Sequence, residues 1–255
     1  MIDAGVVQSS METVERIFRE HRDVLLSSFG NTTYRVKDDH TPVTELDIAL
    51  EKTIRDALLN EFSNLGFQGE ETGHTGSTDA YWCVDPIDGT SSYIRGMPYA
   101  TNMAALIVDG ETRASLIYDF VHDILYTAKK GEGAFRNGEP LRIVEKDRFH
   151  DHVVFSLGGA LFSQLREALH ELNMKALLPL TASGYAYTML AEGKIDGVAQ
   201  IDPGALLHDM APGVLLAEEA GFVLYNLEQT EGIARARYII GRPGLVARIE
   251  ASGLL

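Results

Sequence analysis

The sequence predicts an α/β protein with an α+β N-terminal half and an α/β C-terminal half. Apolar residues in the first 60 positions mostly recur at the three- and four-residue steps of helices. Short β-rich runs separated by turn residues follow. After about residue 150, strand-like and helix-like segments alternate, which is typical of α/β layers. We expect one catalytic unit over residues 1–255, with subdomains at about 1–148 and 149–255.

Composition excludes several classes of protein. The 255 residues carry 37 Asp+Glu against 22 Lys+Arg, a net charge of −15, so we expect no nucleic-acid partner. A single cysteine, Cys83, excludes an intramolecular disulfide and a multi-cysteine zinc cluster. No apolar run approaches the ~18–20 residues of a membrane span, and the opening MIDAGVVQSS does not resemble a signal peptide. We therefore expect a cytoplasmic enzyme with no membrane association.

Two helices are expected near the start. The first is predicted from Met11, with Ser9 or Ser10 as N-cap and Gly30 as its stop. Its apolar positions are Met11, Val14, Ile17, Phe18, Leu25 and Phe29. The second is predicted to begin near Thr44, with Leu50, Ile54 and Leu58 along one face.

The next segment predicts a largely antiparallel meander. Asp109-Gly110 is the dipeptide of a tight hairpin. The expected strands are Tyr81–Val84, Asn102–Val108, Ala114–Tyr118 and Ile124–Ala128.

The C-terminal half is expected to alternate strands with helices. The strands are predicted at Val153–Leu157, Gly197–Ile201, Val223–Tyr225 and Tyr238–Ile240. The helices are predicted at Leu161–Leu172, Tyr185–Glu192, Ala211–Ala220 (ended by Gly221) and Gly244–Ala251.

The segment Asp85-Pro-Ile-Asp88-Gly-Thr90 carries the clearest chemical signal. It follows an apolar strand, and a turn there would let both carboxylates converge. Such oxygen ligands suit Mg²⁺, with the carbonyl of Ile87 as a further ligand. A helix opening at Gly89-Thr90-Ser91-Ser92 would offer free N–H groups to a phosphate. A solvated Asp-Gly turn remains an equal alternative for this motif alone.

Three other acidic segments have ordinary structural explanations when taken singly. Glu70-Glu71 suits a solvated loop or a helix start. Thr44 and Asp47 fit a capping box. Asp209 suits a plain N-cap before an apolar helix.

Together these segments resemble the inositol monophosphatase family, in the family's order and over nearly the whole chain. The resemblance rests on Thr41–Asp47, Gly69–Glu71, Trp82–Thr90, Asp209–Gly213 with Glu219-Ala-Gly221, and the strand–turn segment Tyr126–Gly138. It implies the layered αβαβα sandwich of the sugar phosphatases, as a homodimer.

The resemblance also implies roles for individual residues. The implied metal ligands are Glu70, Asp85, the carbonyl of Ile87, Asp88 and Asp209. The implied catalytic residues are Glu70 and Thr90, which orient the attacking water, with Asp85 and with Asp47 near a third metal position. The implied substrate-binding residues are Asp88, Gly89, Thr90, Ser91, Asp202 and Asp209; Ser183 is added as a candidate for the pocket wall.

The implied activity is hydrolysis of a phosphomonoester by direct in-line attack of a metal-activated water. We expect two or three Mg²⁺ per site, inhibition by lithium, and a small phosphorylated polyol as substrate. Acidic Asp202 favours a neutral polyol or a cationic leaving group over a second phosphate, and myo-inositol 1-phosphate is the first choice.

Two departures from the family pattern bear on specificity. His208 stands where the family usually has tryptophan, and we expect a packed histidine there rather than a catalytic one. Arg95 lies within the turn Ser91–Gly96, which departs from the commonest family version, and is expected at the surface. A histidinol-phosphatase, another small polyol or nucleotide phosphatase, or a regulatory binding protein on the same scaffold remain alternatives.

Overall fold

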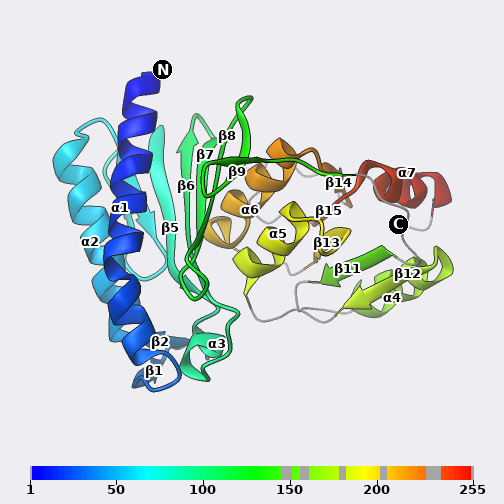
Figure 1. Cartoon of the computed structure of the whole chain (residues 1–255), viewed down its shortest axis with the longest axis horizontal. Helices are drawn as coiled ribbons and strands as arrows, with labels where there is room; N and C mark the ends of the chain where they lie inside the picture. Colours follow the sequence, from blue (N-terminus) through cyan, green and yellow to red (C-terminus); the bar gives the residue numbers. More distant parts are fainter. Residues whose placement is uncertain are drawn as a thin grey trace.

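The computed structural model describes residues 2–144, 151–155, 161–177, 182–201, 206–227 and 237–253. These residues form five layers in the order α-β-α-β-α, which confirms the expected sandwich (Figure 1). The helices α1 (Ala4–Ser28) and α2 (Glu45–Glu61) cover the outer face of the larger sheet.

Four further helices complete the layers. Two of them, α5 (Ser183–Ala191) and α6 (Leu207–Ala220), lie between the two sheets. The other two, α4 (Leu161–Glu171) and α7 (Pro243–Ser252), lie on the far side of the smaller sheet.

The larger sheet has eight strands in the order β10-β9-β8-β7-β6-β5-β3-β4. Its strands are β3 (Gly66–Gly69), β4 (Gly73–Thr75), β5 (Ala80–Asp88), β6 (Thr101–Val108), β7 (Glu111–Asp119), β8 (Ile124–Lys129), β9 (Gly133–Arg136) and β10 (Glu139–Leu141). From β5 to β10 every pairing is antiparallel, which confirms the meander. Strand β3 runs parallel to β5, so both end at the same edge.

The smaller sheet has five strands in the order β12-β11-β13-β15-β14. Its strands are β11 (Asp151–Phe155), β12 (Met174–Leu177), β13 (Gly197–Gln200), β14 (Val223–Asn226) and β15 (Tyr238–Gly241). Strands β11, β12 and β13 are parallel, whereas β15 is antiparallel to both neighbours. The last two residues of the predicted strand Val153–Leu157 lie outside the described residues.

The predicted start of the first helix was wrong. Helix α1 begins at Ala4, because Asp3 caps it by accepting a hydrogen bond from the Gly5 amide at 2.8 Å. Ser10, predicted as a cap, is buried within the helix, where its hydroxyl donates to the Val7 carbonyl. A serine can therefore satisfy its own hydroxyl inside a helix as well as at its end.

Of two later helices, one begins where it was predicted to begin and the other does not. Thr44 caps α2 through the predicted capping box with Asp47. Helix α6 begins at Leu207, earlier than predicted, and it contains Pro212. An internal proline costs about 3 kcal/mol, but burial of nearly every residue from His208 to Ala217 offsets this cost.

A small hairpin and a short helix lie below the larger sheet (Figure 1). The hairpin consists of β1 (Tyr34–Val36) and β2 (Pro42–Thr44), and the helix is α3 (Thr90–Ile94). Among the described helices, none is both long and apolar enough to cross a bilayer.

Candidate metal and phosphate site

A β-bulge brings the two aspartates of the central motif together. Asp85 pairs with Met103 and Asp88 with Thr101, so three steps along β5 match two along β6. Residues three apart in a regular strand point to opposite faces. The extra residue in the bulge lets Asp85 and Asp88 point to the same face. A bulge is also one of the places where a strand tolerates a proline, here Pro86. The expected turn is thus a bulged continuation of the strand.

The neighbouring strand end and one helix start complete an acidic cluster. Glu70 follows β3 directly, and its amide donates to the Val84 carbonyl of β5 at 3.2 Å. Ligand atoms of Asp85, Asp88 and Asp209 lie within 4.8 Å of one another. Those of Glu70, Asp85 and His208 do the same. Asp85 therefore belongs to both groups.

Several carboxylates in the cluster resist ionisation. Burial, followed by the charges of Glu70, Asp88 and Asp209, raises the pKa of Asp85 well above its usual range. Burial and the charge of Asp209 raise the pKa of Asp88 to about 7. Burial raises the pKa of Asp47 to about 6, against hydrogen bonds from Thr44. Burial is the largest cause of each shift, and the charges of neighbouring carboxylates add to it.

Asp88 is held by residues from the C-terminal half of the chain. Its Oδ1 accepts hydrogen bonds from the amide and hydroxyl of Ser183, at 2.9 and 3.0 Å. Its Oδ2 accepts from the Gly184 amide at 2.8 Å and from the Thr101 hydroxyl at 2.9 Å. The start of helix α5 thus fixes an aspartate of strand β5.

Thr90 links Asp47 to the bulge. Its hydroxyl oxygen lies 2.8 Å from the Ile87 carbonyl and 3.2 Å from Oδ1 of Asp47. Oδ2 of Asp47 accepts from the amide and hydroxyl of Thr44. Asp47 therefore belongs to the capping box of α2 and also contacts Thr90, so the capping role does not exclude the predicted role at the site.

Three further residues were predicted for the site: Gly89, Ser91 and Asp202. Gly89 takes the left-handed conformation at φ 78°, which favours glycine, and caps α3. Ser91 lies on α3, where its carbonyl and hydroxyl accept hydrogen bonds from the exposed side chain of Arg95. Asp202 lies outside the described residues. The structure therefore brings Glu70, Asp85, Asp88 and Asp209 together and leaves Asp202 unplaced.

Sequence reasoning missed two residues that support Glu70. Nζ of Lys37 lies 2.7 Å from Glu70 and 2.9 Å from Glu71, so Glu71 is paired rather than solvated. Glu51 is fully buried and accepts hydrogen bonds from the amides of Glu71 and Thr72.

Only one of these two residues left a signal in the sequence. Glu51 lies one turn after Asp47 on the core-facing side of α2, and a charged residue on that side indicates a specific partner. Nothing in the sequence around Lys37 indicates its contact.

The donor set fits divalent cations. Carboxylate and carbonyl oxygens are ligands of Mg²⁺. Oδ1 of Asp85 is buried and has no hydrogen-bond partner among the described residues. A buried oxygen without a partner is costly, and a cation between these carboxylates would satisfy it.

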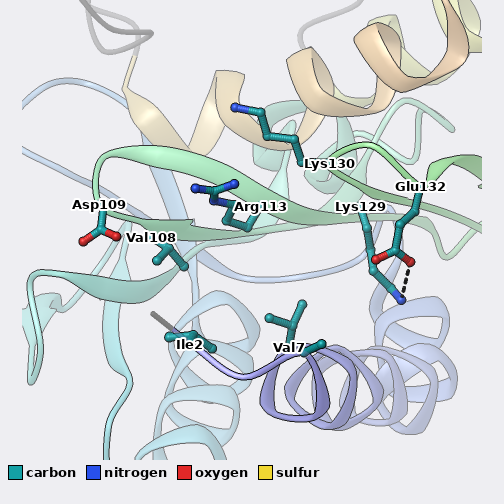
Figure 2. A pocket seen from close by; sticks show the side chains of 9 residues that line it. Ile2, Val7, Val108, Asp109, Arg113, Lys129, Lys130 and Glu132 are labelled. Carbon is teal, nitrogen blue, oxygen red and sulfur yellow. Dashed lines mark hydrogen bonds and ion pairs between the residues drawn. The ribbon is translucent and has the colours of Figure 1, made fainter.

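Two hollows lie outside this cluster. One, with a volume of about 350 Å³, adjoins the site and is lined by Tyr34, Val36, His40, Pro42, Ser91, Ile94 and Arg95. The other, of about 320 Å³, lies beside the start of α1 (Figure 2). Its cations are paired, Lys129 with Glu132 and both Lys130 and Arg113 with Glu111, so it offers little net charge to a ligand.

Fold and site define a five-layer α/β protein with a buried acidic centre suited to divalent cations. The inositol monophosphatase family model matches residues 3–253. The chain belongs to this family, as the sequence resemblance predicted.

Individual relatives agree with this assignment. The chain is 32% identical over 221 residues to an inositol-1-monophosphatase of Rhizobium meliloti, covering 82% of this chain and 81% of the relative. It is 30% identical over 255 residues to a histidinol-phosphatase of Chlorobaculum parvum, covering 95% and 96%. The solved structure of the extragenic suppressor protein suhB of Bartonella henselae superposes with a TM-score of 0.83 at 24% identity, covering 96% of this chain and 98% of that chain.

Proposed function

We propose that this protein is a divalent-metal-dependent phosphomonoester hydrolase acting on a small phosphorylated polyol. The observation that carries the proposal is the position of Asp85, which contributes a ligand atom to each of the two groups. The relatives named inositol-1-monophosphatase and histidinol-phosphatase support the reaction class. We take myo-inositol 1-phosphate as the first candidate substrate and histidinol phosphate as the second.

Glu70, Asp85 and the Ile87 carbonyl would hold one Mg²⁺, and Asp85, Asp88 and Asp209 a second. When bound, such ions lower the pKa of water and stabilise negative charge on phosphate and leaving group. We propose two or three ions per site, with Asp47 near the third position.

The protein's own groups would position the reactants. Glu70 would accept the proton of the attacking water after Lys37 moves away from it. The Thr90 hydroxyl, held near Asp47 and Ile87, would orient that water for in-line attack. The amides of Gly89 and Thr90 would donate to the phosphate. Most of the rate enhancement would come from positioning and electrostatics.

Other features of the family resemblance stay predictions. We propose a homodimer in the cytoplasm, with the two sheets as subdomains of one catalytic unit. We also propose inhibition by lithium, which would compete for the position held by Asp85, Asp88 and Asp209.

Phosphate release from purified protein tests the proposal. The substrates are myo-inositol 1-phosphate, histidinol phosphate, fructose 1,6-bisphosphate, adenosine 3′,5′-bisphosphate and glycerol 2-phosphate, each with Mg²⁺ or EDTA. We expect Asp88→Asn to lose at least ~10²-fold of the activity. Asp123→Asn makes the same change on an exposed ion-paired residue and should retain activity. Near-normal turnover in Asp88→Asn, or no metal-dependent release from any substrate, would reject the proposal.

A further inference from the structure

His208 has a position that ordinary packing does not explain. It lies at the start of α6 directly before Asp209, and only 4% of its surface is exposed. Its Nδ1 is buried without a hydrogen-bond partner among the described residues. Its Nε2 lies 3.9 Å from Oδ1 of Asp209, too far for a hydrogen bond.

The histidine is directed at the acidic cluster. A ring nitrogen of His208 and oxygens of Glu70 and Asp85 lie within 4.8 Å of one another. Ligands that surround one divalent ion at about 2.0–2.2 Å are separated by roughly 3–4.4 Å. Small side-chain rotations would therefore let all three bind the same ion.

Burial makes an unused imidazole nitrogen unfavourable at this position. A buried polar atom without a partner costs about 1–3 kcal/mol. A structural histidine would normally hydrogen-bond to a carbonyl or a carboxylate. Coordination through Nδ1 would instead give that nitrogen a partner, and coordination through Oδ1 of Asp85 would do the same for that oxygen.

We infer that His208 coordinates the divalent ion held by Glu70 and Asp85, and that it gives this position a preference for Mn²⁺, Co²⁺ or Zn²⁺ over Mg²⁺. The inference rests on the metal site of the proposed function. Imidazole suits first-row transition ions, whereas carboxylate and carbonyl oxygens suit Mg²⁺. The group formed by Asp85, Asp88 and Asp209 contains only oxygen ligands and keeps its suitability for Mg²⁺. The two positions thus differ in their metal preference.

Calorimetry on the EDTA-treated full chain tests the inference. Mn²⁺, Zn²⁺ and Mg²⁺ are titrated separately into wild type and His208→Asn. We expect the variant to bind Mn²⁺ and Zn²⁺ at least about tenfold more weakly, with a smaller loss for Mg²⁺. The control is His122→Asn, because His122 is about half exposed and contacts Asp119 outside the cluster. It should bind all three ions as wild type does.

A second measurement needs no substitution at His208. X-ray absorption of wild-type protein with one equivalent of Zn²⁺ shows whether imidazole is bound to the metal. We expect one imidazole with oxygen ligands, and the same spectrum in His122→Asn. A shell of oxygen alone would overturn the inference, even if His208→Asn failed to fold. Equal losses for all three ions in a folded variant would also overturn it.

Activity separates this inference from the proposed function. Imidazole-bound zinc without phosphate release under any metal would reject the proposed function and support the role of His208. Mg²⁺-dependent release with only oxygen ligands on zinc would reject the role of His208 and support the proposed function.

Discussion

The amide of Gly184 donates to Oδ2 of Asp88 at 2.8 Å, across 96 positions of sequence. The contact joins the start of α5 to the end of β5, and the neighbouring Ser183 adds two further hydrogen bonds. An acidic group at a helix N-terminus is stabilised by the helix dipole. The C-terminal half of the chain thus orients an aspartate of the N-terminal half.

The close approach of Gly184 leaves no room for a side chain. A Cβ there would lie 2.4 Å from Oγ1 of Thr101 and 3.0 Å from Oδ2 of Asp88. We predict that Gly184→Ala displaces Asp88 and weakens Mg²⁺ binding at least about tenfold, by calorimetry. Gly244→Ala is the control, because a Cβ at Gly244 meets nothing within 4 Å. Wild-type Mg²⁺ affinity in Gly184→Ala would contradict this account of Asp88.

The single ammonium of Lys37 pairs with both Glu70 and Glu71. We predict that Lys37→Met leaves two adjacent carboxylates uncompensated and lowers metal-free stability by about 1–3 kcal/mol. Mg²⁺ should then raise the melting temperature more than in wild type, because it no longer competes with the lysine. Thermal denaturation with and without MgCl₂ measures both effects. Lys130→Met removes an exposed pair with Glu111 and should change neither; an unchanged Mg²⁺ response in Lys37→Met would argue against competition.

Glu51 supports the turn that carries Glu70. We predict that Glu51→Ala lowers the free energy of unfolding by about 3 kcal/mol or more, because the amides of Glu71 and Thr72 lose their acceptor. Urea denaturation measures this loss. Glu45→Ala, on the exposed first turn of α2, should stay within about 0.5 kcal/mol of wild type. A similar small change in Glu51→Ala would show that these hydrogen bonds contribute little.

Mg²⁺ binding should strengthen as pH rises toward neutrality. The pKa of Asp88 is raised to about 7 and that of Asp47 to about 6. These raised values stabilise the metal-free folded chain most below about pH 4, and that stabilisation is lost as pH rises through 6 and 7. Bound Mg²⁺ requires the ionised carboxylates, so binding releases protons.

We therefore predict a larger increase in melting temperature with Mg²⁺ at pH 8 than at pH 5.5. Thermal denaturation with MgCl₂ at both pH values, against NaCl at equal ionic strength, measures it. Equal increases in melting temperature at the two pH values would show that the carboxylates are already ionised at pH 5.5 without Mg²⁺.

Local chemistry made much of the fold predictable. The capping box of Thr44 and Asp47, the Asp109-Gly110 hairpin and the stop at Gly221 each depend on residues within a few positions. The start of α1 was not predictable from Ser9 and Ser10, because Val6 and Val7 pack against the core and the helix begins at Ala4 with Asp3 as its cap.

The sequence by itself determined the family, the layered α/β class and the acidic residues near Asp85, because residue types and short spacings carry that information. Only the tertiary structure decided which residues meet. The bulge that aligns Asp85 with Asp88 depends on pairing with β6, and the contact of Lys37 with Glu70 depends on how a hairpin folds back. The direction of His208 toward Glu70 likewise depends on where α6 begins between two sheets. Such contacts join segments far apart in the chain, so no local pattern specifies them.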